Sequence, residues 1–441
     1  MWIVLALAFG GPAAADDTIT ASVAQTATAT SSALPAVIEG TRAGEAAPVA
    51  PLPNKERPRY LIKTIVGLLA LLALAYLGGH ARVRALEARL GISQLVTAGF
   101  PFVALGIIAR RPEIGILTDR VLADLSPLLR LGLGWIGFTV GFRFDVRMLD
   151  TLPSGSALLI GLRTLVPFFT VVVLCGLYLG GASGPGFLRE ALILGTASAM
   201  TAGTVGSGSA VGKLIHLEEL GAIAGLMCLA SFFRPDEVVQ WQLPGTAWLF
   251  VSLGLGAAIG FVVYAVMRVP ATGADSLVLM LGSIAFASGM AGNVRLSPVA
   301  SCFVAGVLLV NFPGAYKQRL TDALERLKRP IYLLFLLVVG ALWDPTDLSG
   351  WVLMTVFVVA RLGGKMLGTL LASRSSAVVP FDLRSVMVAP MGPLSIAIVV
   401  AAILLYPTGH TAWLVTAVIG GAIVTELIVQ ISRWPALRTR A

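Results

Sequence analysis

Charged residues are scarce in this chain, and that scarcity decides its class. Only 12% of the 441 residues are Asp, Glu, Lys or Arg, while 57% are hydrophobic. A soluble domain carries roughly 25% charged residues. Many apolar runs approach the ~20 residues that cross a bilayer as a helix. The composition therefore excludes an ordinary soluble domain and predicts an all-α polytopic membrane protein.

Cysteine and histidine are also rare, which limits the chemistry available. Cys175, Cys228 and Cys302 each stand alone in an apolar segment, so we expect no disulfide framework. The three histidines give no metal-ligand spacing. No P-loop motif is present, which disfavours an ATP-driven pump. We predict no enzymatic activity, no cofactor and no metal site.

The net charge of +9 does not indicate a nucleic-acid partner. In a membrane protein, Lys and Arg mostly mark cytoplasmic loops. We expect the partners to be a lipid bilayer and small ions, with no nucleic acid.

The N-terminal part differs in composition from the rest. Residues 1–16 contain an apolar run followed by small residues, which predicts a secretory signal peptide, although a basic n-region is missing. Residues 17–56 are rich in Ala, Thr and Pro with almost no aromatics, which predicts a disordered tail. Residues 57–441 form the transmembrane part.

We predict thirteen membrane spans in this part from its apolar runs. Their expected ranges are 60–79, 93–109, 127–142, 156–180, 187–212, 217–241, 245–267, 274–292, 297–312, 329–344, 350–372, 385–405 and 410–432.

Loop charge predicts the orientation of the spans. Basic residues concentrate in the odd-numbered connections, most densely after the ninth span, whereas the connections after spans six, ten and twelve have none. Because basic loops stay inside, we expect a cytoplasmic C-terminus and a periplasmic N-terminus in the inner (plasma) membrane.

Span five contains an unusual number of helix-weakening residues. Five glycines from Gly195 to Gly212 alternate with Ser198, Thr201, Thr204 and two further serines. We expect this helix to unwind partway, and unwound backbone at membrane depth survives only beside protein or a water-filled cavity. The pattern is typical of an ion site in a secondary transporter.

A weak internal repeat predicts a second interruption. Residues 140–145 and 339–344 share the pattern V-G-x-x-aromatic-D, at the ends of spans seven apart, so the two copies would be inverted. Moving seven spans on from span five reaches span twelve, which contains Pro390, Gly392 and Pro393. Inverted repeats with paired broken helices are a common transporter design.

Two acids lie late in span six. Asp236 and Glu237 are the candidate carriers of a cation or a proton, because competition for one carboxylate is the simplest exchange mechanism. The alternative is that residues 234–237 form a loop beyond a short helix.

Polar residues in other spans complete the predicted site. Arg361 and Lys365 share one helix face in span eleven. They either balance the acid or clamp the broken helices, or else they are structural charges satisfied by carbonyls at a helix C-terminus. Thr201, Thr204 and Ser198 offer hydroxyl oxygens to a cation, although such hydroxyls often bond their own backbone. We assign packing or interface roles to Arg163, Asp275 and Glu426.

Several stretches together resemble the monovalent cation:proton antiporter superfamily, the sodium/proton exchangers and Kef-type potassium/proton systems. They are FTVGFRFDVRML, GTASAMTAGTV, GLMCLASFFRPDEVV, FASGMAGNVRLSPVASCFVAGVLL, RPIYLLFLLVVGALWD and VFVVARLGGKMLG. Their order and spacing, over residues 63–433, carry the resemblance more than any single motif.

The resemblance implies a thirteen-helix antiporter fold with inverted repeats. Spans five and twelve would cross as broken helices in a mobile core of spans 4–6 and 11–13, and spans 1–3 and 8–10 would form a dimerisation part. The family's carrier aspartate matches Asp236, or Glu237 in an alternative register, and its basic residue in span eleven matches Arg361. Pro235 and the lack of an acid after Thr201 or Thr204 depart from the family pattern.

We therefore expect a homodimeric antiporter that exchanges Na⁺ or K⁺ for H⁺ by an elevator-like movement. Two other classes remain open at this point. Arg361, Lys365 and Arg163 would also suit an anion transporter or channel, and a member that has lost transport would act as a sensor or scaffold.

Overall fold

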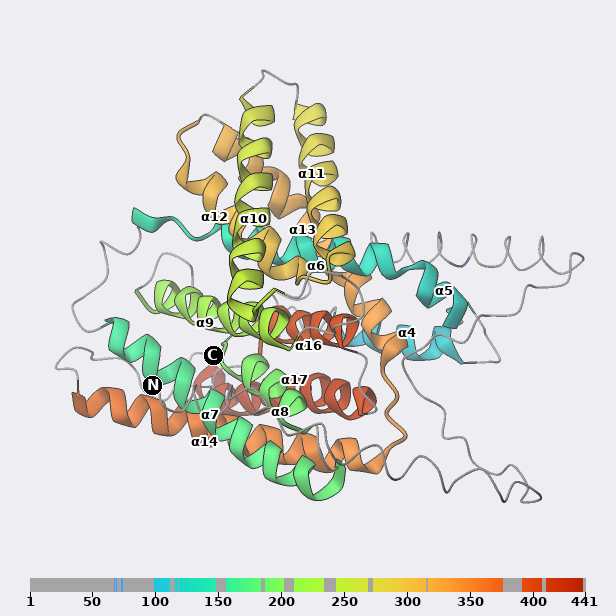
Figure 1. Ribbon diagram of the computed structural model, residues 1–441. Helices are drawn as coiled ribbons and strands as arrows, with labels where there is room; N and C mark the ends of the chain where they lie inside the picture. The colour runs from blue at the N-terminus through green and yellow to red at the C-terminus, as the bar shows by residue number, and fades with distance from the viewer. Residues whose placement is uncertain are drawn as a thin grey trace, which may run out of the picture. The chain divides into compact units, whose positions relative to one another are not determined.

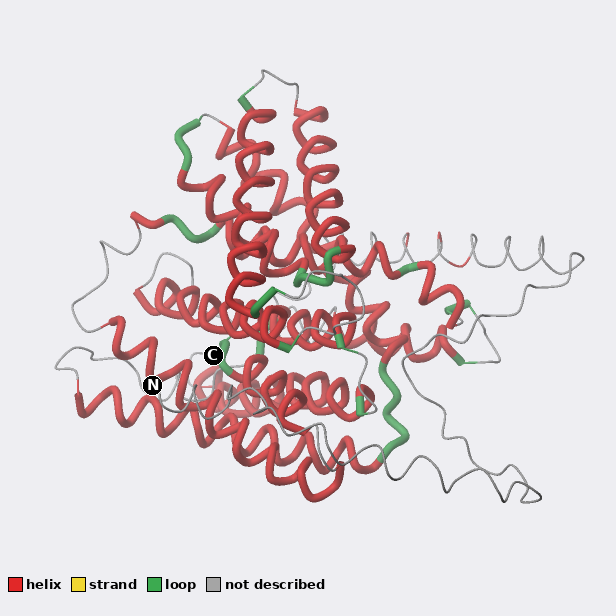
Figure 2. Tube along the Cα trace, viewed as in Figure 1, coloured by secondary structure: helices red, strands yellow, loops and turns green. Residues whose placement is uncertain are grey.

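The computed structural model describes residues 67, 69, 73, 99–111, 116–117, 119–147, 156–183, 187–201, 210–233, 243–268, 273–314, 316–375, 391–406 and 410–438. These residues are almost entirely helical and contain no strand (Figures 1 and 2). The all-α prediction is confirmed. The predicted signal peptide, tail and nearly all of the first span lie outside the described residues.

Thirteen helices are present in the described ranges. They are α4 (Phe100–Arg110), α5 (Asp119–Asp124), α6 (Ser126–Phe142), α7 (Ser156–Ser183), α8 (Phe187–Ser198), α9 (Ala210–Phe232), α10 (Gly245–Met267), α11 (Gly273–Asn293), α12 (Pro298–Asn311), α13 (Tyr316–Leu342), α14 (Leu348–Ser375), α16 (Pro393–Leu405) and α17 (Thr411–Arg438).

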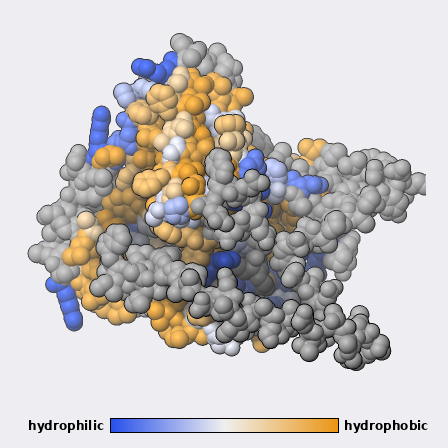
Figure 3. All heavy atoms as spheres, viewed as in Figure 1, coloured by the Kyte–Doolittle hydropathy of each residue, from blue (hydrophilic) through white to orange (hydrophobic). Residues whose placement is uncertain are grey.

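Most helices match the predicted spans because long apolar runs determine both. In the described residues, four helices are long and apolar enough to cross a membrane, within α7, α10, α14 and α17. Large apolar side chains on α10 and α11 are exposed, among them Phe250, Phe261 and Phe286. Figure 3 shows hydrophobic residues over much of the visible surface. Exposed apolar side chains of this kind suit contact with lipid.

Two expected segment boundaries are wrong. The stretch from Ile215 to Leu220, expected as a short polar link between the two segments around spans five and six, lies within the continuous helix α9. The basic connection after span nine, residues 316–328, is the first half of helix α13. Tyr316, Leu320 and Leu324 recur every four residues and are buried, so one apolar stripe packs inward while the basic residues share the same helix.

The helices pack in two sets. In the first set, α6 packs against α12 and α4 packs against α13, and α10 and α11 join them (Figure 1). In the second set, α7 packs against α14 and α8, and α14 packs against α17. Helix α9 contacts both sets. Glycine permits close crossings; for example, a Cβ on Gly137 of α6 would lie 2.1 Å from the carbonyl oxygen of Val299 in α12. Close backbone approach through small residues is typical of membrane helix pairs.

Hydrogen bonds tie connections at each end of the bundle. At one end, Tyr178 near the end of α7 donates to the carbonyl of Ser349 at the start of α14. At another, the Asn311 side chain at the end of α12 donates to Phe144 O and accepts from Val146 N, just beyond α6. The end of α7 is thus tied to the start of α14, and the end of α12 to the segment after α6.

Candidate functional site: a broken-helix crossing

Helix α8 stops in the middle of the predicted fifth span. Its last residue, Ser198, donates its hydroxyl to Gly195 O at 2.7 Å and is also 3.4 Å from Pro167 O. Ala199, Met200 and Thr201 are buried and not helical. The predicted interruption of span five is therefore present at residues 199–201, the part of it that the structure describes.

Helix α16 begins in the middle of the predicted twelfth span. Gly392 is extended, with φ −94° and ψ 171°, and Pro393 follows at the first helical position, where its missing N–H costs nothing. The Ser395 hydroxyl donates to Ala197 O at 3.0 Å. The C-terminal end of α8 thus meets the N-terminal end of α16, and the partial charges of the two ends are opposite in sign.

Two basic side chains of α14 donate hydrogen bonds to carbonyl oxygens at the end of α8. Arg361 and Lys365, one helical turn apart, are 0% and 1% exposed. The Arg361 Nη2 donates to Met200 O at 3.0 Å, and the Lys365 Nζ donates to Ala199 O at 2.7 Å. Carbonyls beyond a helix end have no partner inside the helix, so these side chains satisfy groups that the break exposes.

A proline in α7 supplies a further acceptor for Lys365. Pro167 has no N–H, so it leaves the carbonyl of Arg163, four residues earlier, without its helical donor. The Lys365 Nζ donates to this carbonyl at 3.0 Å. One ammonium group therefore joins the kink of α7 to the end of α8.

The third partner of Lys365 is Glu218, an acid that the sequence analysis did not single out. Its Oε2 accepts from Lys365 Nζ at 2.9 Å, and its Oε1 accepts from Arg163 Nε at 2.5 Å. All three side chains are at least nine-tenths buried. An intramembrane acid paired with basic residues is the usual way for such charges to persist in a bilayer.

Glu218 was missed because its neighbourhood reads as a polar link. A signal was present, since Gly221 and Gly225 follow it at three and seven residues and so share its helix face. A Cβ on Gly221 would lie 2.3 Å from the Thr164 side chain, and one on Gly225 would lie 3.0 Å from that of Thr196. These glycines let α9 approach α7 and α8 closely enough for Glu218 to reach Arg163.

The structure brings some of the predicted site residues together. Thr201, Ser198, Arg361 and Lys365 all lie at the helix break, and Arg163, assigned to packing, is part of the same network. The Thr201 hydroxyl is fully buried and makes no hydrogen bond within the described ranges. Thr204, Asp236 and Glu237 lie outside those ranges, in 202–209 and 234–242.

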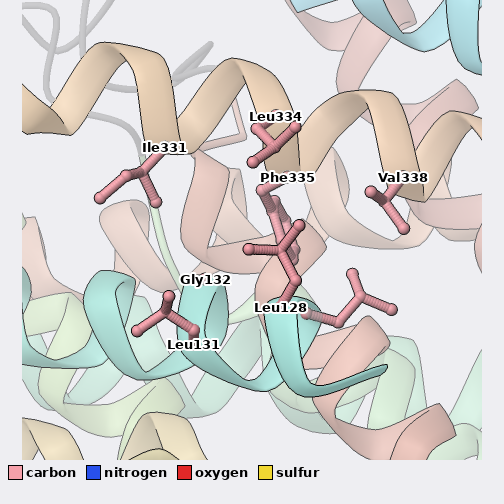
Figure 4. Close-up of a pocket in the computed structure, with 8 residues that line it drawn as sticks. Leu128, Leu131, Gly132, Ile331, Leu334, Phe335 and Val338 are labelled. Atoms are coloured by element: carbon pink, nitrogen blue, oxygen red, sulfur yellow. The ribbon is translucent and has the colours of Figure 1, made fainter. Parts of the chain in front are cut away.

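An apolar pocket elsewhere offers no ligand for an ion. It measures about 40 Å³ and lies between α6 and α13, where Leu128, Leu131, Ile331 and Phe335 line it with other apolar residues (Figure 4). Nor do the described residues contain a group of three His, Cys, Asp or Glu able to hold a metal ion. The polar groups of the helix break lie apart from this pocket, on α7, α8, α9, α14 and α16.

Comparison with known proteins bears on this arrangement. Neither a scan against protein-family models nor a search of curated proteins gives a match. Among solved structures, the chain is similar to the sodium proton antiporter MjNhaP1 from Methanocaldococcus jannaschii at pH 8. The TM-score is 0.59 at 14% identity, covering 85% of this chain and 96% of that chain. The chain has the sodium/proton antiporter fold.

The antiporter fold accounts for the helical composition and the long apolar helices together. The protein is therefore a multi-pass membrane protein. The likeness extends across nearly the whole of the solved antiporter chain, so it is not limited to a local helical motif.

Proposed function

We propose that this protein is a secondary antiporter that exchanges a monovalent cation, Na⁺ or K⁺, for H⁺. The observation that supports this most strongly is the meeting of α8 and α16 at their broken ends, beside buried Glu218 and Lys365. Interrupted helices whose ends face each other at membrane depth are how transporters build ion sites. The similarity in fold to a sodium proton antiporter agrees with this proposal.

The proposed role of Glu218 follows from the partners that its carboxylate already has. Both carboxylate oxygens of Glu218 already bind basic side chains, so Glu218 positions Lys365 rather than carrying the transported ion. Asp236 is the proposed carrier, with Glu237 assisting, and Arg361 balances charge. Thr201, Thr204 and Ser198 supply neutral oxygens. We further propose a homodimer in the inner (plasma) membrane, with the N-terminus outside and the C-terminus in the cytoplasm.

Proteoliposomes with an imposed pH gradient test the exchange itself. Na⁺, K⁺ and Li⁺ are added in turn while lumenal pH is followed. Dissipation that depends on the identity of the cation supports exchange and names the ion. Dissipation that follows the anion instead, or none in correctly inserted protein, would reject the proposal.

Replacing Asp236 by asparagine tests the proposed carrier. Asparagine keeps the shape but cannot hold a proton, so we expect exchange to be lost while insertion and folding are retained. Cation-dependent dissipation in proteoliposomes and size-exclusion behaviour in detergent measure the two properties. Full exchange by this variant would move the carrier to another acid.

Replacing Thr201 by valine tests the hydroxyl at the break. Valine keeps the volume and removes only the oxygen, which has no partner in the described part of the chain. Loss of one cation ligand should raise the KM for the cation by roughly tenfold, with little change in thermal stability. Thr139→Val in α6 is the matched control, since its buried hydroxyl likewise has no hydrogen bond within the described ranges. An equal KM in the two variants would remove Thr201 from the site.

A further inference from the structure

Helix α8 and two connections meet at one end of the core helices, away from the helix break. Glu190 lies in the first turn of α8, Asp347 in the α13–α14 connection and His410 in the α16–α17 connection. Helix α8 spans 12 residues from Phe187 to Ser198, about 18 Å along its axis. Glu190 in its first turn is therefore separated from the break but joined to it through one rigid element.

The side chains of Glu190 and His410 lie within ion-pair distance of each other, and they differ in exposure. The His410 Nδ1 lies 3.2 Å from Glu190 Oε1, and the side chains are 29% and 6% exposed. The second oxygen, Oε2, is buried and makes no hydrogen bond within the described ranges. A partly exposed imidazole thus contacts an almost fully buried carboxylate.

Charged and aromatic groups from other elements lie at the same end of the helices as His410. The Trp413 indole and the Ser349 backbone N–H donate to Asp347, and they hold the pKa of that carboxyl below its usual range. The Trp413 ring also contacts the His410 ring, with ring centroids 4.4 Å apart and the two planes tilted by 48°. Arg189, a permanent cation, lies over the Tyr406 ring at 5.3 Å.

The remaining titratable neighbours come from the other elements at this end. Tyr178 of α7 bonds the Ser349 carbonyl, and Asp344 of the α13–α14 connection accepts from Thr346. Those Thr346 bonds lower the pKa of Asp344, so it too stays an anion near neutral pH. Histidine is the side chain whose charge ordinarily changes between about pH 5 and 8.

We propose that Glu190 and His410 form a proton-binding site, separate from the helix break, that fastens α8 to α17 when it is protonated. An imidazolium donating to a carboxylate makes a charge-assisted bond, roughly twice as strong as a neutral one. Acidic medium therefore tightens the bond, and alkaline medium weakens it. Because α8 ends at the break, its restraint at one end limits its movement at the other.

Protein stability tests proton binding without reference to transport. Unfolding temperatures of wild type and His410→Gln are compared at about pH 5.5 and about pH 8. The charged pair stabilises the folded state at low pH, so the wild-type advantage should be larger at the acidic value by roughly 2–4 °C. His80→Gln, in the expected first connection, is the matched control and should retain the wild-type pH dependence.

A second variant keeps the test decisive if His410→Gln folds poorly. Glu190→Gln removes the carboxylate and should abolish the same pH dependence, and the double variant should add little, because the two residues act as one unit. Unchanged pH dependence in both single variants, or an equal loss in His80→Gln, would overturn the proton-binding site.

The consequence for transport rests on the proposed function and is measured separately. In proteoliposomes, wild-type exchange should rise as pH increases through the histidine range, and His410→Gln should lose most of that rise. If no variant transports any cation while the stability difference persists, the proposed function fails and the proton site stands. If transport occurs with identical pH profiles, the restraint on α8 is wrong.

Discussion

Replacing Glu218 by alanine should destabilise the protein by about 3–5 kcal/mol, because it removes the carboxylate that neutralises two buried cations. Lys365 would keep only its two backbone carbonyls, and Arg163 would lose the acceptor of its Nε. The expected result is a large fall in unfolding free energy, measured by denaturant titration of the purified protein. A loss under 1 kcal/mol would show that the network is not buried in the membrane-embedded protein.

The double variant Glu218→Gln/Lys365→Gln is the control for this loss. It removes one charge of each sign, so the cost of an unpaired buried charge is reduced, and replacement of a whole buried pair is often close to neutral. We expect it to unfold at a free energy nearer to wild type than either single variant does. Additive losses would mean that Glu218 and Lys365 do not interact.

Replacing Gly364 by alanine should disrupt the helix-break site by forcing the backbones of α7 and α14 apart. A Cβ at this position would lie 2.5 Å from Pro167 Cα, so α14 must move away from the kink of α7. Overpacking of this kind costs about 1–3 kcal/mol. The shift also lengthens the bond from Lys365 Nζ to the Arg163 carbonyl, so exchange should fall together with stability.

Gly363→Ala provides a matched control one residue away. A Cβ on Gly363 meets no atom within 4 Å, and alanine is a better helix former than glycine by about 0.5–1 kcal/mol. This variant should be as stable as wild type or slightly more so, and should retain full exchange. Equal losses in the two glycine variants would contradict the close α7–α14 crossing.

Hydropathy and helix-breaking residues were enough to predict much of the fold. The expected range of span seven, 245–267, coincides with α10, because its apolar run is bounded by Pro244 and Arg268. The interruptions at Ser198 and Pro393 were predicted from glycine, hydroxyl and proline residues that weaken or cannot continue a helix. These features are local, so the sequence displays them directly.

The charge network could not be predicted because its partners are distant in sequence. Glu218 is 55 residues from Arg163 and 147 from Lys365, and its stretch, residues 215–220, reads as a short polar link. Similarly, the basic residues after span nine indicated a connection, whereas packing of Leu320 and Leu324 makes that stretch helical. In both cases tertiary contacts outweighed local polarity.

The most direct measurement is cation-driven proton flux per folded protein for wild type and the Glu218→Gln/Lys365→Gln double variant in matched proteoliposomes. The double variant separates loss of function from loss of folding. If the network at the α8–α16 crossing positions the exchange site, flux should fall at least about tenfold, equivalent to roughly 1.4 kcal/mol or more of barrier. Wild-type flux in the folded double variant would contradict this account and limit the network to a structural role.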